Sequence, residues 1–285
     1  MVLPARKPRP GARLERQPRI SYAQPDDSWL RRSFIGAVEH TMGRPKVERI
    51  YRSLKAEFEP RTFFGDALTR GGVTVNWHGA DRSSIPTSGP LVIIANHPFG
   101  VIDGLVLCDL AMQLRGDFRI LINALLCRDE DLDAFFLPVD FSNTRDAVRT
   151  NVSSRKIAHQ ALANDIPVIV FPAGGISTAN SHFGFGRVQE LPWNSFVAKL
   201  IHQHQANVLP LYFYGRNSRK FHVASNLHEL FRMALLIHEV RNKLGGAINV
   251  ALGELISYAT LQDMSSRRGL TDYLYQTVMA LADTD

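Results

Sequence analysis

The sequence predicts an α/β fold: a single domain with a mixed, largely parallel sheet flanked by helices, preceded by an N-terminal helical pair. One observation is the alternation of short apolar strands with helical segments from about residue 73 onward. The other is composition. The 285 residues are 45% hydrophobic and 21% charged, which is ordinary for a globular protein. A chain of this length and composition can bury a core without disulfides or metals, and it is not a collagen, a disordered chain or a polytopic membrane protein.

The charge of the chain indicates the class of its partner, and its cysteine content indicates the cellular compartment. Lys and Arg number 33 against 27 Asp and Glu, so the formal net charge is +6. This excess favours an anionic partner, namely nucleic acid, a phosphate-bearing substrate or an anionic membrane face. Cys108 and Cys127 both have apolar neighbours, and we expect reduced thiols in a cytosolic chain, with a structural disulfide as the alternative. The sequence contains no apolar run of membrane-spanning length and no signal-peptide pattern.

The N-terminal region divides into two segments. Residues 1–27 are basic and rich in proline, which predicts a disordered tail that is either a membrane-surface tether or a solvated leader. Apolar residues then recur at helical spacing through residues 28–60, which predicts two amphipathic helices separated near Gly43 and Pro45. Their apolar faces can cover the core or lie in a lipid interface, and the core is the more common case.

The remaining chain, residues 61–285, is expected to form the α/β domain. The strands expected there span residues 73–77, 91–95, 118–122, 136–139, 167–171, 208–214 and 247–253. The helices expected between and after them span residues 104–114, 145–163, 193–204, 227–244 and 271–282. No internal repeat or linker is visible after Ser28.

The most informative segment runs from residue 91 to 104, Leu-Val-Ile-Ile-Ala-Asn-His-Pro-Phe-Gly-Val-Ile-Asp-Gly. A buried strand leads directly into Asn96 and His97, at the strand end where open α/β sheets bind ligands. Histidine has an ordinary pKa suited to proton transfer near neutrality. A turn at Pro98 and Gly100 can fold Asp103 back to orient the imidazole, so the segment predicts a general base. The alternative is a turn in which His97 only caps a helix.

A second strand, residues 167–171, ends in Phe-Pro-Ala-Gly-Gly-Ile-Ser-Thr at residues 171–178. The backbone N–H groups of Gly174 and Gly175 can form an anion-binding nest, and Ser177 can donate to phosphate oxygens. The segment lacks the Lys of a P-loop and the spacing of a nucleotide fingerprint. A plain tight turn remains the alternative.

Together these segments resemble the glycerolipid acyltransferase superfamily, typified by lysophosphatidic acid acyltransferase. Its blocks occur in the right order over roughly residues 65–255. They match Asn96, His97 and Asp103 in the first block, Arg145 weakly in the second, Phe171, Pro172, Gly174 and Ser177 in the third, and the apolar strand around Pro210 in the fourth. Five residues separate His97 from Asp103 where the family usually has four, a form similar to the hemolysin-like branch that includes lyso-ornithine lipid acyltransferases.

The third block departs from the family pattern. Ala173 stands where the family has Glu, and Gly175-Ile176 where it has Thr-Arg, so the usual glycerophosphate contacts are partly absent. These departures argue against a lysophosphatidic acid acceptor more than they argue against acyl transfer. Arg145, Arg187 or the cluster from Arg216 to Lys220 is then expected to supply the anion contacts.

The resemblance implies that residues 61–285 are an acyltransferase domain that moves a fatty acyl group from acyl carrier protein or coenzyme A to the hydroxyl of a lyso-lipid. His97 would be the catalytic base and Asp103 would orient it. The substrate-binding residues would be Asn96, Gly100, Arg145, Phe171, Pro172, Gly174, Gly175 and Ser177. No metal or prosthetic group is implied. The expected location is the inner face of the cell membrane, held there by the basic tail and the N-terminal helices.

Other functions compatible with the sequence are a lipid or thioester hydrolase, a catalytically degenerate lipid-binding protein and a nucleic-acid binder. A serine hydrolase is disfavoured because the chain has no Gly-x-Ser-x-Gly elbow. Nucleic acid is disfavoured because the cations are spread along the chain and no known binding module is visible.

Overall fold

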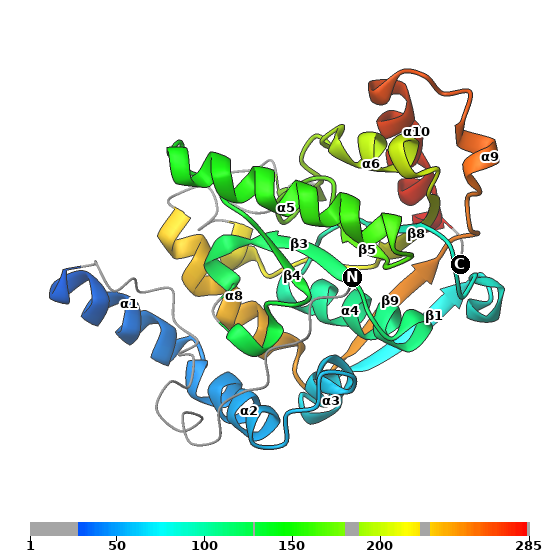
Figure 1. Ribbon diagram of the computed structural model, residues 1–285. Helices are drawn as coiled ribbons and strands as arrows, with labels where there is room; N and C mark the ends of the chain where they lie inside the picture. Colours follow the sequence, from blue (N-terminus) through cyan, green and yellow to red (C-terminus); the bar gives the residue numbers. More distant parts are fainter. Residues whose placement is uncertain (1–27, 128, 180–187, 223–228, 284–285) are drawn as a thin grey trace.

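The computed structural model describes residues 28–127, 129–179, 188–222 and 229–283 (Figure 1). Its strands are β1 (Thr74–Gly79), β2 (Leu91–Ala95), β3 (Arg119–Asn123), β4 (Phe136–Val139), β5 (Val168–Val170), β6 (Thr178–Ala179), β7 (Val188–Gln189), β8 (Asn207–Phe213) and β9 (Ala247–Leu252). Its α-helices are α1 (Trp29–Thr41), α2 (Arg44–Ala56), α3 (Phe63–Arg70), α4 (Val101–Arg115), α5 (Arg145–Ala163), α6 (Phe196–His204), α8 (Glu229–Lys243), α9 (Tyr258–Leu261) and α10 (Arg267–Ala280). The proposed tail, residues 1–27, lies outside the described residues.

Seven strands form one mixed sheet in the order β1-β9-β8-β2-β5-β3-β4. Among the described strands of this sheet, β8 and β9 form the antiparallel pair and every other neighbouring pair is parallel. This confirms the predicted α/β class with a largely parallel sheet. Strand β2 lies near the middle, between β8 and β5, so the polar residues that follow it emerge at the carboxyl edge of the sheet.

The sequence of β2 is apolar throughout because both of its faces are buried. Leu91, Ile93 and Ala95 belong to a core that also contains residues of α2, α3 and α4. Val92 and Ile94 belong to the opposite core, which is built with α5, α6 and α10. The domain therefore has three layers, and Figure 1 shows α5, α6 and α10 on one side of the sheet and α3 and α4 on the other.

The two expected N-terminal helices are present as α1 and α2. Both helices contact α8, and α2 also contacts α3. Apolar residues of α2, Ile50 and Leu54 among them, pack against the core, which is the more common of the two cases expected from the sequence. The first turn of α1 differs, because Trp29 and Leu30 are exposed.

Several boundaries differ from the prediction for local reasons. Helix α4 begins at Val101 rather than residue 104, because the Asp103 carboxylate accepts the Gly100 N–H and caps the helix one turn earlier. Helix α3 was not expected, since its two turns give too few repeats for periodicity to stand out. Among the described residues, no helix is both long and apolar enough to cross a membrane.

Candidate active site

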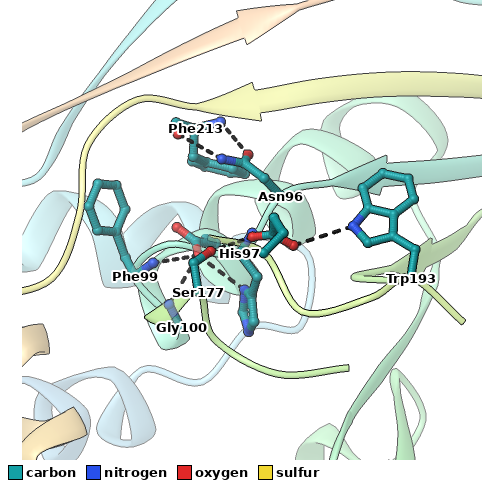
Figure 2. A network of polar contacts seen from close by, with 9 residues as sticks. Asn96, His97, Phe99, Gly100, Ser177, Trp193 and Phe213 are labelled. Atoms are coloured by element: carbon teal, nitrogen blue, oxygen red, sulfur yellow. Dashed lines mark hydrogen bonds and ion pairs between the residues drawn. The ribbon is translucent and has the colours of Figure 1, made fainter. Parts of the chain in front are cut away.

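The end of β2 is fixed to the neighbouring strand by Asn96. Its amide Nδ2 donates to the Phe213 carbonyl at 3.0 Å, and its Oδ1 accepts the Phe213 N–H at 2.7 Å (Figure 2). Both groups are buried, so this pair of hydrogen bonds joins the ends of β2 and β8 without access to water. Asn96, expected to bind substrate, therefore uses its amide to hold the backbone from which His97 projects.

The turn after His97 brings Asp103 back toward it, as predicted. Asp103 is fully buried, and its Oδ2 accepts the N–H groups of Phe99 at 2.9 Å and Gly100 at 3.0 Å. Gly100 has φ +88°, and a Cβ there would lie 2.7 Å from Ile176 Cδ1. The backbone conformation therefore strains any side chain at Gly100, and a Cβ there would also require the end of the Ile176 side chain to shift. The extra residue between His97 and Asp103 is accommodated in this turn.

His97 and Asp103 form the central pair of the site. His97 Nδ1 lies 3.1 Å from Asp103 Oδ2, although the angle falls outside hydrogen-bond alignment. Loose alignment of this kind is common in substrate-free sites and tightens when the reactants bind. The imidazole is also stacked on the Phe171 ring, with centroids 3.9 Å apart and planes inclined by 25°. The carboxylate and the aromatic ring together restrict the imidazole to one orientation.

The Glu190 carboxylate holds the main chain around His97. This residue was not among those predicted from the sequence. Its Oε1 accepts the His97 N–H at 2.9 Å and the Ser177 hydroxyl, and its Oε2 lies 3.4 Å from Trp193 Nε1. The Ser177 N–H in turn donates to the His97 carbonyl at 2.9 Å. One carboxylate thus joins the first block, at His97, to the third, at Ser177. No local motif marks Glu190, which lies 93 residues from His97 in the chain.

The loop after β5 forms the wall facing His97. Phe171, Pro172, Gly174 and Gly175 all line the same cavity as His97. Gly174 has φ +66°, and its N–H donates to the Phe171 carbonyl at 2.9 Å, closing a tight turn. The Ser177 hydroxyl, expected to contact phosphate, is buried and donates to Glu190 instead. The structure therefore brings the first and third blocks together.

His97 opens onto a cavity of about 790 Å³. Its lining is mainly apolar and comes from α2, α3, α4, α8, the strands β3 and β4, and the loop after β5. Along α4 the cavity is lined by Val101, Gly104, Leu105 and Cys108, so it extends from the catalytic turn along that helix. Burial raises the pKa of the Cys108 thiol well above its ordinary value, so Cys108 is an inert wall residue. Volume and lining suit a long apolar ligand.

Two of the three expected sources of anion contacts are not part of this cavity's lining. Arg145 is exposed at the start of α5, and neither it nor the Arg216 to Lys220 cluster is among the described lining residues. Arg187 lies outside the described residues. A cation that sequence reasoning missed, Lys243 on α8, lies 4.0 Å from the Phe99 ring centroid. Burial lowers the pKa of its amine, while Glu239 and Asp103 act in the opposite direction.

Both cysteines are free thiols, Cys108 buried and Cys127 half-buried. Over the described ranges, His, Cys, Asp and Glu do not gather into groups of three or more that could hold a metal ion. His202 and His204 lie two residues apart on α6 and have different partners: His202 Nε2 contacts the Met264 carbonyl at 3.1 Å, while His204 contacts His159 on α5.

Curated proteins and a solved structure are similar to this chain. A lyso-glycine lipid O-acyltransferase from Phocaeicola vulgatus is 32% identical over 149 residues, covering 50% of this chain and 49% of that protein. A second protein with that name, from Bacteroides thetaiotaomicron, is 25% identical over 209 residues, covering 70% and 72%. The match thus spans about half the length of the first relative.

A solved structure, the 1-acyl-sn-glycerophosphate (LPA) acyltransferase PlsC from Thermotoga maritima, superposes with a TM-score of 0.52 at 14% identity. The match covers 89% of this chain and 96% of that one. At this identity the likeness concerns the fold, and it confirms the α/β architecture. A family profile described as "Acyltransferase" matches residues 26–284. The chain therefore belongs to the acyltransferase family, within the glycerolipid acyltransferase superfamily that its sequence blocks indicated.

Proposed function

We propose that this chain is an O-acyltransferase that moves a fatty acyl group from a thioester donor to the hydroxyl of a lyso-lipid in membrane lipid synthesis. The observation that carries the proposal is that His97, paired with Asp103, lines a large apolar cavity. A base and an apolar ligand site in contact are what acyl transfer to a lipid hydroxyl requires. The names of the two curated relatives support a lyso-lipid acceptor.

The chemistry follows from the imidazole geometry. With Nδ1 directed at Asp103, Nε2 is the nitrogen left to accept a proton from the acceptor hydroxyl. The resulting alkoxide attacks the thioester carbonyl, the tetrahedral intermediate collapses, and the thiolate leaves and takes up the proton from His97. The enzyme forms no covalent intermediate, because both reactants are held together. A positioned base contributes about 10²–10⁴-fold to the rate.

The oxyanion formed during attack needs hydrogen-bond donors. The Gly174 N–H is already bonded to the Phe171 carbonyl. The next two residues, Gly175 and Ile176, line the cavity, and their N–H groups have no hydrogen-bond partner among the described residues. We assign the oxyanion contact to these two N–H groups, of which Gly175 belongs to the pair of glycines expected to bind an anion.

The apolar cavity is the proposed site of the fatty acyl chain. Its walls are built from buried aliphatic and aromatic side chains, with few polar atoms along α4 and α2. Burying an alkyl chain there contributes about 0.8 kcal/mol per methylene. The thioester carbonyl would then lie at the His97 end, with its carrier, acyl carrier protein or coenzyme A, outside.

The proposed acceptor is a lyso-lipid with an amino-acid head group. Ala173 lines the cavity where the family pattern has Glu, and Ile176 replaces its Arg, so contacts to a glycerophosphate are reduced. The curated relatives are named for a glycine lipid, and the sequence form around Asp103 is similar to the lyso-ornithine lipid branch. These two acceptors lead the proposal, ahead of lysophosphatidic acid.

The test is acyl transfer by the purified chain on lipid vesicles. Labelled acyl-carrier-protein and acyl-coenzyme A donors are offered with lyso-glycine lipid, lyso-ornithine lipid or lysophosphatidic acid, and products are separated by chromatography. We expect a two-chain product from an amino-acid lyso-lipid with the wild type and none with His97→Ala. Release of free fatty acid without a two-chain product would indicate a hydrolase. Lipid binding with no turnover in the wild type would indicate a degenerate enzyme.

A further inference from the structure

Helix α5 has an exposed flank that combines apolar and basic side chains. Val148 and Val152 are 63% and 60% exposed, although they lie one turn apart near the start of a helix whose other face is buried. At 3.6 residues per turn, arginines and a lysine fall on the same flank as the two valines. We call this set the α5 flank, and its members are Arg145, Val148, Arg149, Val152, Arg155 and Lys156.

The α5 flank is continuous with the mouth of the cavity. Arg155 belongs to both, since it lines the cavity and lies over the Phe196 ring at 5.3 Å. Phe141, just before the helix, is 61% exposed and also lines the cavity. Leu191 is exposed at the same rim, where a Cβ on Gly175 would lie 2.9 Å from its Cδ1. Large apolar side chains therefore surround the opening as well as the helix flank.

The charge of this region is positive. Between Arg145 and Ile157 the helix carries four cations and one carboxylate, Asp146, which lies 3.4 Å from Arg149. In Figure 1 one end of α5 and helix α1 both lie at the left of the view, and the first residues of α1, Trp29 and Leu30, are exposed. Basic residues mixed with exposed apolar ones complement an anionic bilayer, which attracts the cations and accepts the apolar side chains.

An acidic carrier protein would also complement the cations, but it carries no acceptor lipid. A bilayer covers both kinds of side chain at once. It also supplies the acceptor lipid and receives the product at the opening through which both must pass.

We propose that the α5 flank is a membrane-docking surface, which places the cavity mouth against an anionic bilayer. The proposal deepens the proposed function, because the bilayer is the source of the lyso-lipid. The orientation keeps the lyso-lipid hydroxyl within reach of His97 without the lipid crossing water.

The test measures binding of the full chain to sedimenting vesicles of phosphatidylcholine, with and without phosphatidylglycerol. One variant is Val148→Asp with Val152→Asp, and the second is Arg149→Glu with Lys156→Glu. The matched control is Ile157→Asp, which changes a partly exposed apolar residue on the opposite flank of the same helix. Turnover is measured in parallel with detergent-dispersed lyso-lipid, where docking is not needed.

We expect the valine variant to lose about tenfold or more in partitioning to anionic vesicles, because two apolar contacts are lost and two anions are added. The charge variant should lose about 25-fold or more, at about fivefold for each removed cation, and the loss should shrink at high salt. Ile157→Asp should bind as the wild type does, and all three should keep wild-type turnover in detergent.

Wild-type vesicle binding by both double variants would overturn the proposal. It would equally be overturned if the variants kept vesicle binding but lost binding to immobilised acyl carrier protein, since the flank would then dock a carrier. A wild type that binds vesicles through this flank but never turns over would leave the docking surface intact and refute the proposed function alone.

Discussion

Filling the cavity at two depths along α4 should shorten the preferred acyl chain by two different amounts. Gly104 lines the cavity, and a Cβ built there meets nothing within 4 Å, so a leucine side chain would enter open space. Replacing a helical glycine also favours the helix by up to about 1 kcal/mol, so folding should not suffer. Cys108 lines the same wall one turn further from the catalytic turn, about 6 Å along the axis.

The expected difference follows from chain geometry. An extended alkyl chain advances roughly 1.3 Å per methylene, so the obstruction at Gly104 lies about four to five methylenes nearer the thioester than the one at Cys108. Each methylene excluded from the cavity forfeits about 0.8 kcal/mol, or roughly fourfold in kcat/KM. Gly104→Leu should therefore prefer a chain about four to five carbons shorter than the optimum of Cys108→Leu.

The assay is kcat/KM over a series of saturated acyl donors with one fixed acceptor. Gly36→Leu is the matched control, since Gly36 is another helical glycine with open space around it and lies away from the cavity. Thermal melts verify that each variant is folded. A wild-type chain-length profile in Gly104→Leu would refute the placement of the acyl chain along α4.

Three further outcomes follow from the same contacts. Glu190→Gln should lower kcat by about tenfold to a hundredfold with little change in KM, because the charged acceptor that holds the catalytic loop is lost. Steady-state kinetics measure this change, and an unchanged kcat would contradict the expectation. Asn96→Ala should destabilise the fold by about 2 kcal/mol or more, since the buried N–H and C=O of Phe213 lose their partners; urea unfolding measures this, and a loss below 0.5 kcal/mol (about the scatter of such data) would contradict it. His159 Nδ1 and His204 Nε2 lie 2.9 Å apart, and burial lowers the pKa of both side chains. The fold therefore favours their neutral forms, and the stability of the protein should fall as pH drops below about 6.5. A melting temperature that does not change with pH in this range would contradict this, as would an equal change in the double variant His159→Asn with His204→Asn.

The parts of the site carried by local sequence were predictable. The strand before Asn96 is apolar without alternation because both its faces are buried, and the polar residues begin where it ends. The return of Asp103 to His97 depends on a turn with a glycine at positive φ, which Gly100 signals directly. The same holds for the loop at Gly174. Each of these features depends on residues that are close together in the sequence, so the local sequence is enough to predict it.

The remaining parts depend on residues that are distant in the chain. Glu190 reaches His97 only because the segment after β7 passes beside the end of β2, and nothing around it in the sequence announces this contact. The cavity is assembled from several separate elements, so its existence follows from packing rather than from any motif. Ser177 lies in the loop that the motif predicts, and its hydroxyl was expected to contact phosphate. In the structure this hydroxyl donates to the Glu190 carboxylate instead.

The proposed function depends above all on His97, oriented by Asp103, acting as the base for acyl transfer to a lipid hydroxyl. The most direct measurement is the rate of two-chain lipid formation by the wild type, His97→Gln and a matched His78→Gln variant, with saturating donor and lyso-lipid. His78 lies exposed on β1 and does not line the cavity. We expect a loss of about 10²-fold or more in His97→Gln and a wild-type rate in His78→Gln. A folded His97→Gln enzyme that forms product at the wild-type rate would contradict it.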